Sequence, residues 1–275
     1  MTESLAHAMA TLREGDRDRY LSILYAPEDR RKALAALYAF NVEIARVRDL
    51  IHEPLPGEIR LQWWRDAIAG GQPTTGNPLA DALIQTISRH DLPPDAFDNY
   101  IEARIFDLYD DPMTDRNMLE GYCGETASTL IQLAAMILDR AAAPSYAALA
   151  GHAGCAQAIA GLMRLLPVHC MRGQCYIPAD ILAAAGTDRE AMLSAAAGEN
   201  EKQAVLAMVA LGREHLARFE KDAGALPDTL RPAFLPAGLA GAYLDRVARA
   251  PLSGGSDIPA IKKHWIMLRR ATRGW

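Results

Sequence analysis

Apolar residues recur at helical spacing through most of this chain, and proline or glycine marks the ends of these stretches. Pro27-Glu28-Asp29 places a proline and two acids where a helix begins, and the pattern then continues to Ile51. The further stretches with this pattern are 58–69, 79–90, 94–109, 114–138, 146–166, 178–185, 189–223, 231–249 and 258–270. No stretch shows the sustained apolar/polar alternation with β-branched residues that indicates a strand. The sequence therefore predicts an all-α bundle.

The composition suits one domain. Half of the 275 residues are hydrophobic, which is enough for one sizeable core, and no linker, charge block or repeat divides the chain. We therefore expect a single domain over residues 1–275. The polar start Met1-Thr2-Glu3-Ser4 lacks the pattern of a secretory signal, and the four cysteines form no CxxC pair. These features predict a cytoplasmic protein with reduced thiols.

Two classes of partner or location are disfavoured. The formal net charge of −5 does not indicate a nucleic-acid-binding protein. The stretch 146–163 contains no Asp, Glu, Lys or Arg, but it is rich in alanine and glycine and contains His152 and Gln157. A buried helix of a bundle fits this composition better than a membrane span.

Two segments carry a resemblance to a known family. They are Tyr20-Leu-Ser-Ile-Leu-Tyr-Ala-Pro27 with Arg30-Arg31 and Leu37-Tyr38-Ala39-Phe40, and Arg164 through Arg172-Gly173-Gln174-Cys175-Tyr176-Ile177-Pro178. With Asp107 and Tyr122-Cys123 between them, they resemble the squalene/phytoene synthases. The resemblance implies a single-domain isoprenoid-synthase bundle with a central cavity walled by the helices around 34–51, 94–109, 114–138 and 146–166.

In that family, two aspartate-rich motifs bind Mg²⁺, which holds the diphosphates of two prenyl substrates. Here the first motif falls on Ala45-Arg46-Val47-Arg48-Asp49 and keeps only its last aspartate. Leu165 and His169 occupy the two aspartate positions of the second motif, and Pro167 between them interrupts the helical hydrogen bonding. Mg²⁺ prefers oxygen ligands such as carboxylates, and only one aspartate of the two motifs remains. We therefore expect neither a metal site nor a cofactor. Asp49 paired with an arginine and Asp49 as a site remnant both stay open.

Cationic side chains offer a different kind of site. Arg46 and Arg48 stand beside or in place of the lost acids, and guanidinium groups bind phosphate directly. Arg164 is the only charge in a long apolar stretch and needs a partner, for which Asp49, Asp107 or a ligand phosphate are the candidates. Arg46, Arg48, Arg164 and Tyr176 are therefore the candidate residues for binding a ligand or diphosphate, and a purely structural role for Arg164 stays open.

Three further segments point to one branch of the family. Arg60-Leu-Gln-Trp-Trp-Arg-Asp66, Glu125-Thr-Ala-Ser-Thr-Leu130 and Ala156-Gln157-Ala158-Ile159 resemble the phytoene-synthase-like assembly factors of respiratory complex I. That branch has also lost its acidic motifs. The resemblance implies a non-catalytic assembly factor or a prenyl- or lipid-binding protein, with respiratory-complex subunits as partners.

Two alternatives remain at this point. One is a divergent prenyltransferase that joins two prenyl diphosphates head to head and rebuilds an Mg²⁺ site from Asp49, Asp107, Asp110 and Asp111. The other is a bundle that only mediates protein contacts, its cavity filled by side chains such as Leu165.

Some patterns favour packing over a special role. The residues that would form a soft-metal cluster are His152, Cys155, His169, Cys170 and Cys175, but their spacing matches no standard zinc site. For Trp63-Trp64 we expect one ring in the core and the other half exposed. The basic, partly apolar C-terminal stretch 262–275 fits either an ordinary last helix or a helix on an anionic membrane, which would add peripheral contact with the inner membrane.

Overall fold

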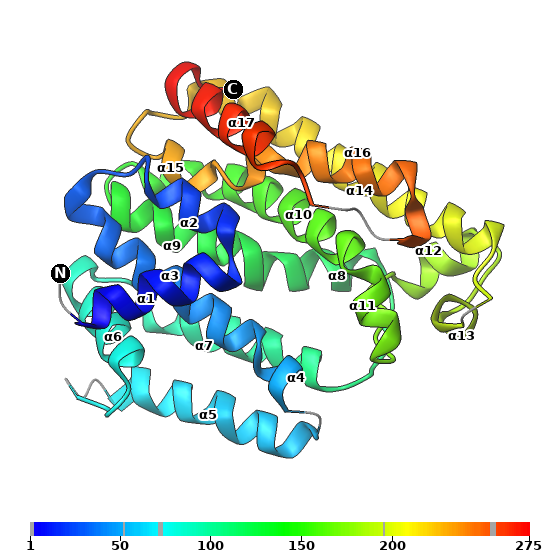
Figure 1. Ribbon diagram of the computed structural model, residues 1–275, viewed down its shortest axis with the longest axis horizontal. Coiled ribbons are helices and arrows are strands. Elements are labelled where there is room, and N and C mark those ends of the chain that lie inside the picture. The colour runs from blue at the N-terminus through cyan, green and yellow to red at the C-terminus, as the bar shows by residue number, and fades with distance from the viewer. Residues whose placement is uncertain (1–2, 52, 71–73, 195, 254–256) are drawn as a thin grey trace. The chain divides into compact units, whose positions relative to one another are not determined.

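The computed structural model describes residues 3–51, 53–70, 74–194, 196–253 and 257–275 (Figure 1). Within these residues every regular element is helical and no strand occurs, which confirms the predicted all-α class. In the described part of the chain, no helix is both long enough and apolar enough to cross a membrane.

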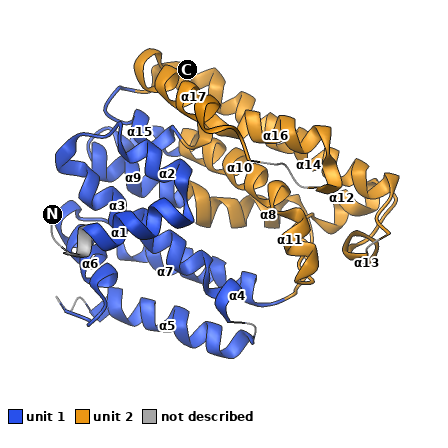
Figure 2. Cartoon of the chain, viewed as in Figure 1, with its two compact units in different colours: residues 1–109, 129–147, 227–235 blue, residues 110–128, 148–226, 236–275 orange. Residues whose placement is uncertain are grey.

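The chain forms two compact units, each built from three separate stretches (Figure 2). Unit 1 comprises 1–109, 129–147 and 227–235, and unit 2 comprises 110–128, 148–226 and 236–275. The helices predicted to wall a central cavity are shared between the units, so that cavity and the single-domain organisation stay predictions.

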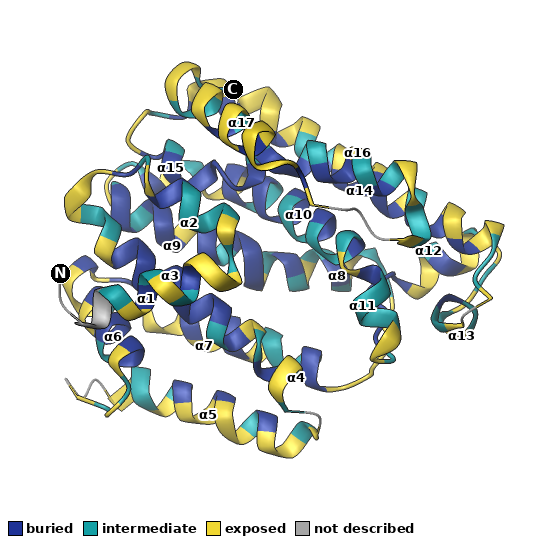
Figure 3. Ribbon diagram, in the orientation of Figure 1, coloured by how far each residue is buried: buried dark blue, intermediate teal, exposed yellow. Residues whose placement is uncertain are grey.

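The helices of unit 1 surround one buried helix, α3 (Glu28–Ala45), in which nearly every residue from 33 to 44 is buried (Figure 3). The others are α1 (Glu3–Gly15), α2 (Arg17–Ile23), α4 (Val47–Leu50), α5 (Pro54–Gly70), α6 (Pro78–His90), α7 (Pro94–Ile105), η1 (Phe106–Leu108), α9 (Thr129–Leu138), η3 (Ala143–Tyr146) and α15 (Arg231–Phe234). Small alanines along α3 let α1, α6 and α9 pack closely against it.

An aromatic cluster fixes α5 and α7 to α3. The Phe40 ring lies 5.2 Å from Trp64, 5.7 Å from Phe97 and 5.5 Å from Tyr100, measured between ring centroids. Trp64 is fully buried whereas Trp63 is 39% exposed, as expected for the pair. Burying these large rings together stabilises the packing of the three helices.

Helices α1 and α2 were not predicted from the sequence. α1 buries Ala8 and Leu12, and its contacts are chiefly with α3. α2 begins after Asp16, whose carboxylate accepts a hydrogen bond from the Arg19 N–H at 3.0 Å. Leu5, Ala8, Met9 and Leu12 have the spacing of one helical face, so the signal for α1 was present in the sequence, whereas α2 is only seven residues long and too short to show a clear period.

Unit 2 is built around α10 (Ala147–Arg164) and the long α14 (Glu199–Asp222). Its other helices are α8 (Arg116–Cys123), the π-helical turn η2 (Gly124–Ser128), α11 (Leu166–Met171), α12 (Ala179–Ala184), α13 (Arg189–Leu193), η4 (Ala223–Ala225), η5 (Ala237–Leu239), α16 (Ala240–Arg249), η6 (Pro251–Ser253) and α17 (Ala260–Arg273). α14 contacts α12, α16 and η6.

Several stretches predicted as single helices are interrupted, including 27–51, where α3 ends at Ala45 and α4 begins at Val47. The stretch 114–138 contains the π-helical turn η2. The stretch 189–223 divides into α13 and α14 because Glu201 accepts a hydrogen bond from the Gly198 N–H at 2.5 Å, which starts a new helix there. The stretch 231–249 divides near Pro236, which has no N–H to continue the helical bonding.

Candidate functional site

The first motif segment lies at one end of α3 in unit 1. α3 ends at Ala45 and α4 starts at Val47, with Arg46 between them at φ −80° and ψ −9°. Ala45 and Asp49 are exposed, whereas Arg46 and Arg48 are half-buried. A break of one residue therefore leaves two guanidinium groups and one carboxylate along this short segment.

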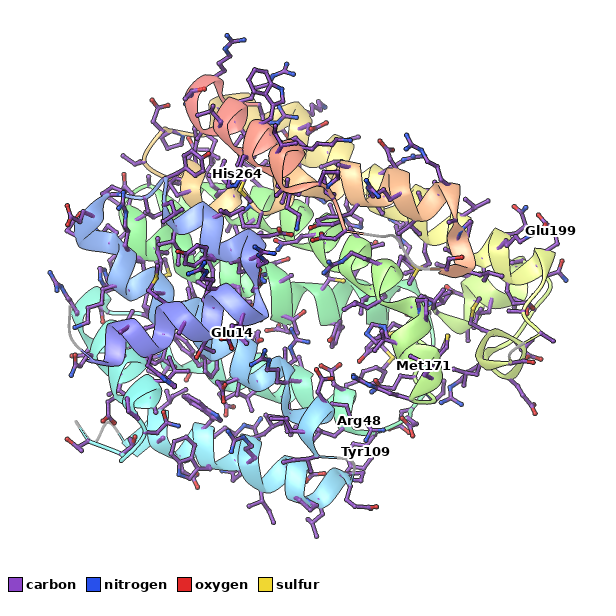
Figure 4. All side chains as sticks on the ribbon, viewed as in Figure 1. Glu14, Arg48, Tyr109, Met171, Glu199 and His264 are labelled. Atoms are coloured by element: carbon purple, nitrogen blue, oxygen red, sulfur yellow. The ribbon has the colours of Figure 1, made fainter. Side chains whose placement is uncertain are left out.

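The same end of unit 1 holds Asp107. Helix α4 packs against η1, which carries Asp107, and against α5 (Figure 4 labels Arg48 on α4 and Tyr109 just after η1). Tyr109 donates a hydrogen bond to Glu58 on α5. The structure thus places the first motif segment next to the element that carries Asp107.

Asp107 belongs to a buried polar chain rather than to an open acidic site. Its Oδ2 accepts a hydrogen bond from Arg104 Nη1 at 2.9 Å, and Arg104 Nε lies 3.3 Å from the Tyr100 hydroxyl. Tyr100 in turn donates to Asn41 Oδ1 at 2.8 Å, and burial raises the Tyr100 pKa. Asp107 is only 8% exposed, so its charge is balanced by Arg104 inside unit 1.

Asn41 and Arg104 were not among the site residues predicted from the sequence. The available signal was the spacing of Arg104 and Asp107, three residues apart, which lets the two side chains meet on one helical face. Glu43, the other acid near Asp49 on this segment, pairs with Arg60 at 3.3 Å near the surface. Neither pairing provides a group of open carboxylates.

No metal centre forms from the acids, histidines and cysteines of the described residues, where no group of three or more such side chains is arranged to hold an ion. The prenyltransferase alternative needs Asp49 and Asp107 of unit 1 to converge with Asp110 and Asp111 of unit 2, and it stays a prediction. Asp110 and Asp111 are exposed. The soft-metal cluster that the sequence disfavoured is not found either.

The second motif segment lies in unit 2, where α10 ends and α11 begins. Pro167 occupies the first turn of α11, so the helix breaks at Leu165 as the sequence predicted. Leu165 is 40% exposed and does not fill a packed interior. The His169 and Tyr176 rings lie 4.8 Å apart, and Tyr122 lies 5.8 Å from Tyr176. The family's second motif position and its downstream tyrosine therefore meet, but the carboxylate is replaced by an imidazole.

Arg164 has a protein partner that was not among those predicted. Its Nη1 lies 3.8 Å from Asp257 Oδ1, and its guanidinium stands 4.9 Å from the centre of the Tyr243 ring. Asp257 also accepts hydrogen bonds from Lys263 Nζ at 2.7 Å and the Tyr243 hydroxyl at 3.0 Å. Burial opposes ionisation of Asp257, but these donors prevail and lower its pKa. The structure gives Asp257, not Asp49 or Asp107, as the carboxylate that balances Arg164.

A polar network that was not predicted from the sequence joins α8, α10 and α14. His152 Nδ1 lies 3.1 Å from His215 Nδ1, and His215 Nε2 lies 3.1 Å from Glu120 Oε1. Arg116 donates to Glu120 at 2.6 Å and to Glu214 at 3.1 Å. Burial alone would raise the Glu120 pKa, but hydrogen bonds from Arg116 and His215 lower it. No motif marks these residues, because they are distant in sequence.

A small apolar pocket in unit 2 is a poor candidate for a prenyl ligand. Its volume of about 130 Å³ is below the roughly 300 Å³ at which ligand pockets usually begin. Pro112, Met113, Ile177 and Leu182 form much of its wall. Arg189 lies at its edge, but donates to two backbone carbonyls at 2.9 and 2.7 Å.

Comparison with known proteins decides the family. The sequence pattern of the Squalene/phytoene synthase family matches residues 12–257. The chain belongs to this family. The chain is 29% identical over 249 residues to NADH dehydrogenase (ubiquinone) complex I, assembly factor 6 of Rattus norvegicus, covering 90% of this chain and 74% of the relative. The assembly factor 6 of Bos taurus is 30% identical over 244 residues, covering 88% and 73%.

Solved structures share the fold. Squalene synthase HpnC from Alicyclobacillus acidocaldarius matches with a TM-score of 0.75 at 19% identity, over 92% of this chain and 95% of that one. A dehydrosqualene synthase in complex with ligand matches with a TM-score of 0.82 at 15% identity, over 97% and 95%. These matches confirm the predicted isoprenoid-synthase fold of this family member.

Proposed function

We propose that this family member is a non-catalytic assembly factor for respiratory complex I. The residues at the two motif segments carry the proposal. Asp49 is the one carboxylate left at the first motif, beside Arg46 and Arg48, and the second motif offers Leu165 and His169. Mg²⁺ coordination, and the stabilisation of a leaving diphosphate that depends on it, need several carboxylate oxygens in one place.

Two further observations support this role. Asp107 is ion-paired to Arg104, so using it as a metal ligand would require breaking a largely buried pair. The relatives named as complex I assembly factor 6 are 29% and 30% identical to this chain, whereas the squalene synthase HpnC, although similar in fold, is 19% identical. Fold likeness alone does not carry catalytic activity.

In this proposal the protein acts from the cytoplasm, in peripheral contact with the inner membrane, and needs no metal or cofactor. Its partners are subunits of the respiratory complex during assembly. The half-buried Arg46 and Arg48 are the candidate groups for an anionic ligand such as a prenyl diphosphate or a phospholipid headgroup. Such a ligand would be bound without ionisation of its diphosphate.

The test combines a cellular assay with an enzymatic one. Cells that lack this gene are complemented with wild-type protein or Asp49→Ala, and assembled complex I is measured by native electrophoresis and NADH oxidation in membranes. We expect deletion to reduce complex I and both proteins to restore it. Purified protein is incubated with farnesyl or geranylgeranyl diphosphate and Mg²⁺, with a working phytoene synthase as the positive control.

The two functions give opposite patterns. Complex I unaffected by the deletion would refute the assembly role. Mg²⁺-dependent diphosphate release that is lost in Asp49→Ala would establish the prenyltransferase alternative. A protein that restores complex I and releases no diphosphate fulfils the proposal.

A further inference from the structure

Helix α17 presents an apolar stripe to solvent. Ile261 is 81% exposed, Trp265 67% and Leu268 45%. Their spacing of four and three residues places them on one side of the helix, so they form a continuous outward face. We call these three residues the α17 stripe. Figure 3 shows the mostly exposed surface of α17.

The opposite side of α17 holds the helix to unit 2. Met267 is fully buried, and the half-exposed Asp257 receives the buried Lys263 ammonium at 2.7 Å. Arg270 pairs with Glu220 at 2.7 Å. The ion pairs of Lys263 and Arg270 therefore lie on the inner side of α17, and the α17 stripe lies on the outward side.

The charge beside the stripe has one sign. α17 contains no acidic residue. At about 100° per residue, Lys262, Arg269 and Arg273 lie along one edge of the stripe, and His264, labelled in Figure 4, lies along the other. All four are exposed. A row of cations beside an apolar strip is the pattern of a helix lying at a membrane surface, with cations at headgroups and apolar groups below them.

We propose that the outward face of α17 docks on an anionic phospholipid bilayer, with the helix axis parallel to the membrane plane. Trp265 lies in the middle of the stripe, and tryptophan favours the boundary between headgroups and acyl chains. The uniform positive charge complements a continuous negative surface. This inference deepens the peripheral membrane contact of the proposed function by naming the surface and the class of lipid. Vesicle binding by the purified chain is measured without complex I, so the assembly role and the membrane contact can fail separately.

Binding is measured by sedimentation of the full chain with vesicles. One set contains phosphatidylglycerol and phosphatidylcholine in equal parts, and the other contains phosphatidylcholine alone. We expect binding to the anionic vesicles that weakens steeply as salt is raised, since each cation near the surface contributes roughly fivefold. The neutral vesicles should bind at least about 10-fold more weakly.

Two sets of variants separate the stripe from its charged edge. Ile261→Ser with Trp265→Ser should weaken binding at least about 10-fold by removing apolar insertion. The matched control, Leu55→Ser with Ile59→Ser, alters two residues at the same spacing on α5 that are 68% and 64% exposed, and should bind as wild type.

The charged edge is tested by changing three cations to glutamine. Changing Lys262, Arg269 and Arg273 should weaken binding about 100-fold. The control changes three other exposed cations, Arg13, Lys32 and Arg89, which gives the same change in net charge. Circular dichroism and gel filtration show that each variant is folded.

Several results overturn the proposal. Wild-type protein that does not sediment with anionic vesicles overturns it, as does equal loss of binding in the control variants. Sedimentation equilibrium tests whether a second copy of this chain binds the stripe instead. A dimer that becomes a monomer in the Ile261/Trp265 double variant would make the stripe a contact between copies of this chain. Loss of complex I assembly with intact vesicle binding would concern the assembly role alone.

Discussion

Two glycines in α10 should respond in opposite ways to the same substitution. A Cβ added to Gly154 would lie 2.2 Å from Ser128 Oγ and 2.5 Å from both the Cα and the N of Ser128. A Cβ added to Gly161 would meet nothing within 4 Å. Two of the atoms against Gly154 are backbone, so no side-chain rotation relieves the clash. α10 and η2 must therefore separate by about 1 Å to accommodate alanine.

The expected free energies of unfolding follow from two opposing effects. Alanine is favoured over glycine inside a helix by about 1 kcal/mol, so Gly161→Ala should raise the free energy of unfolding by about 0.5–1 kcal/mol. Gly154→Ala gains the same preference but overpacks a backbone contact, which costs about 1–3 kcal/mol and occasionally more. Because backbone and not a flexible side chain is hit, we expect the upper end, and a net loss of about 2 kcal/mol.

The assay is urea unfolding at 25 °C, followed by far-ultraviolet circular dichroism. An unchanged slope against urea with a lower midpoint for Gly154→Ala, and a higher midpoint for Gly161→Ala, would support the geometry. A Gly154→Ala protein that is as stable as wild type would refute the close approach of α10 to η2. Equal destabilisation by both substitutions would show that α10 does not tolerate alanine for another reason.

Further predictions concern the ionisable groups. Asp107→Asn should cost about 2–4 kcal/mol by leaving the Arg104 charge poorly balanced, whereas Glu43→Gln, at a surface pair, should cost less than about 1 kcal/mol; urea unfolding compares them. Asp257→Asn should cost about 1–2 kcal/mol and speed hydrogen exchange in α17, read by mass spectrometry. Burial lowers the pKa of His152. The stability that the neutral imidazole contributes is therefore fully present above the unfolded-state pKa of 6.5, and it is lost as the pH falls through the folded-state pKa. Stability should therefore fall as the pH drops below about 6.5, less steeply in His152→Gln, and a pH-independent midpoint would contradict this.

The local pattern of residues determined much of the fold. Apolar residues every 3.6 positions indicated the buried α3, and Pro167 indicated the break after α10, because helical spacing and a missing N–H act within a few residues of the chain. The loss of the acidic motifs was also visible in the sequence, since Ala45, Leu165 and His169 cannot act as carboxylates whatever surrounds them.

Only the tertiary structure decided which charged groups meet. Arg164 pairs with Asp257, nearly a hundred positions away, and His152 meets His215 across α10 and α14. Neither partner follows from sequence spacing, because long-range pairing depends on how helices pack. The same holds for Gly154: the sequence shows a helix-weakening glycine, and only the packing of α10 on η2 supplies the reason for it.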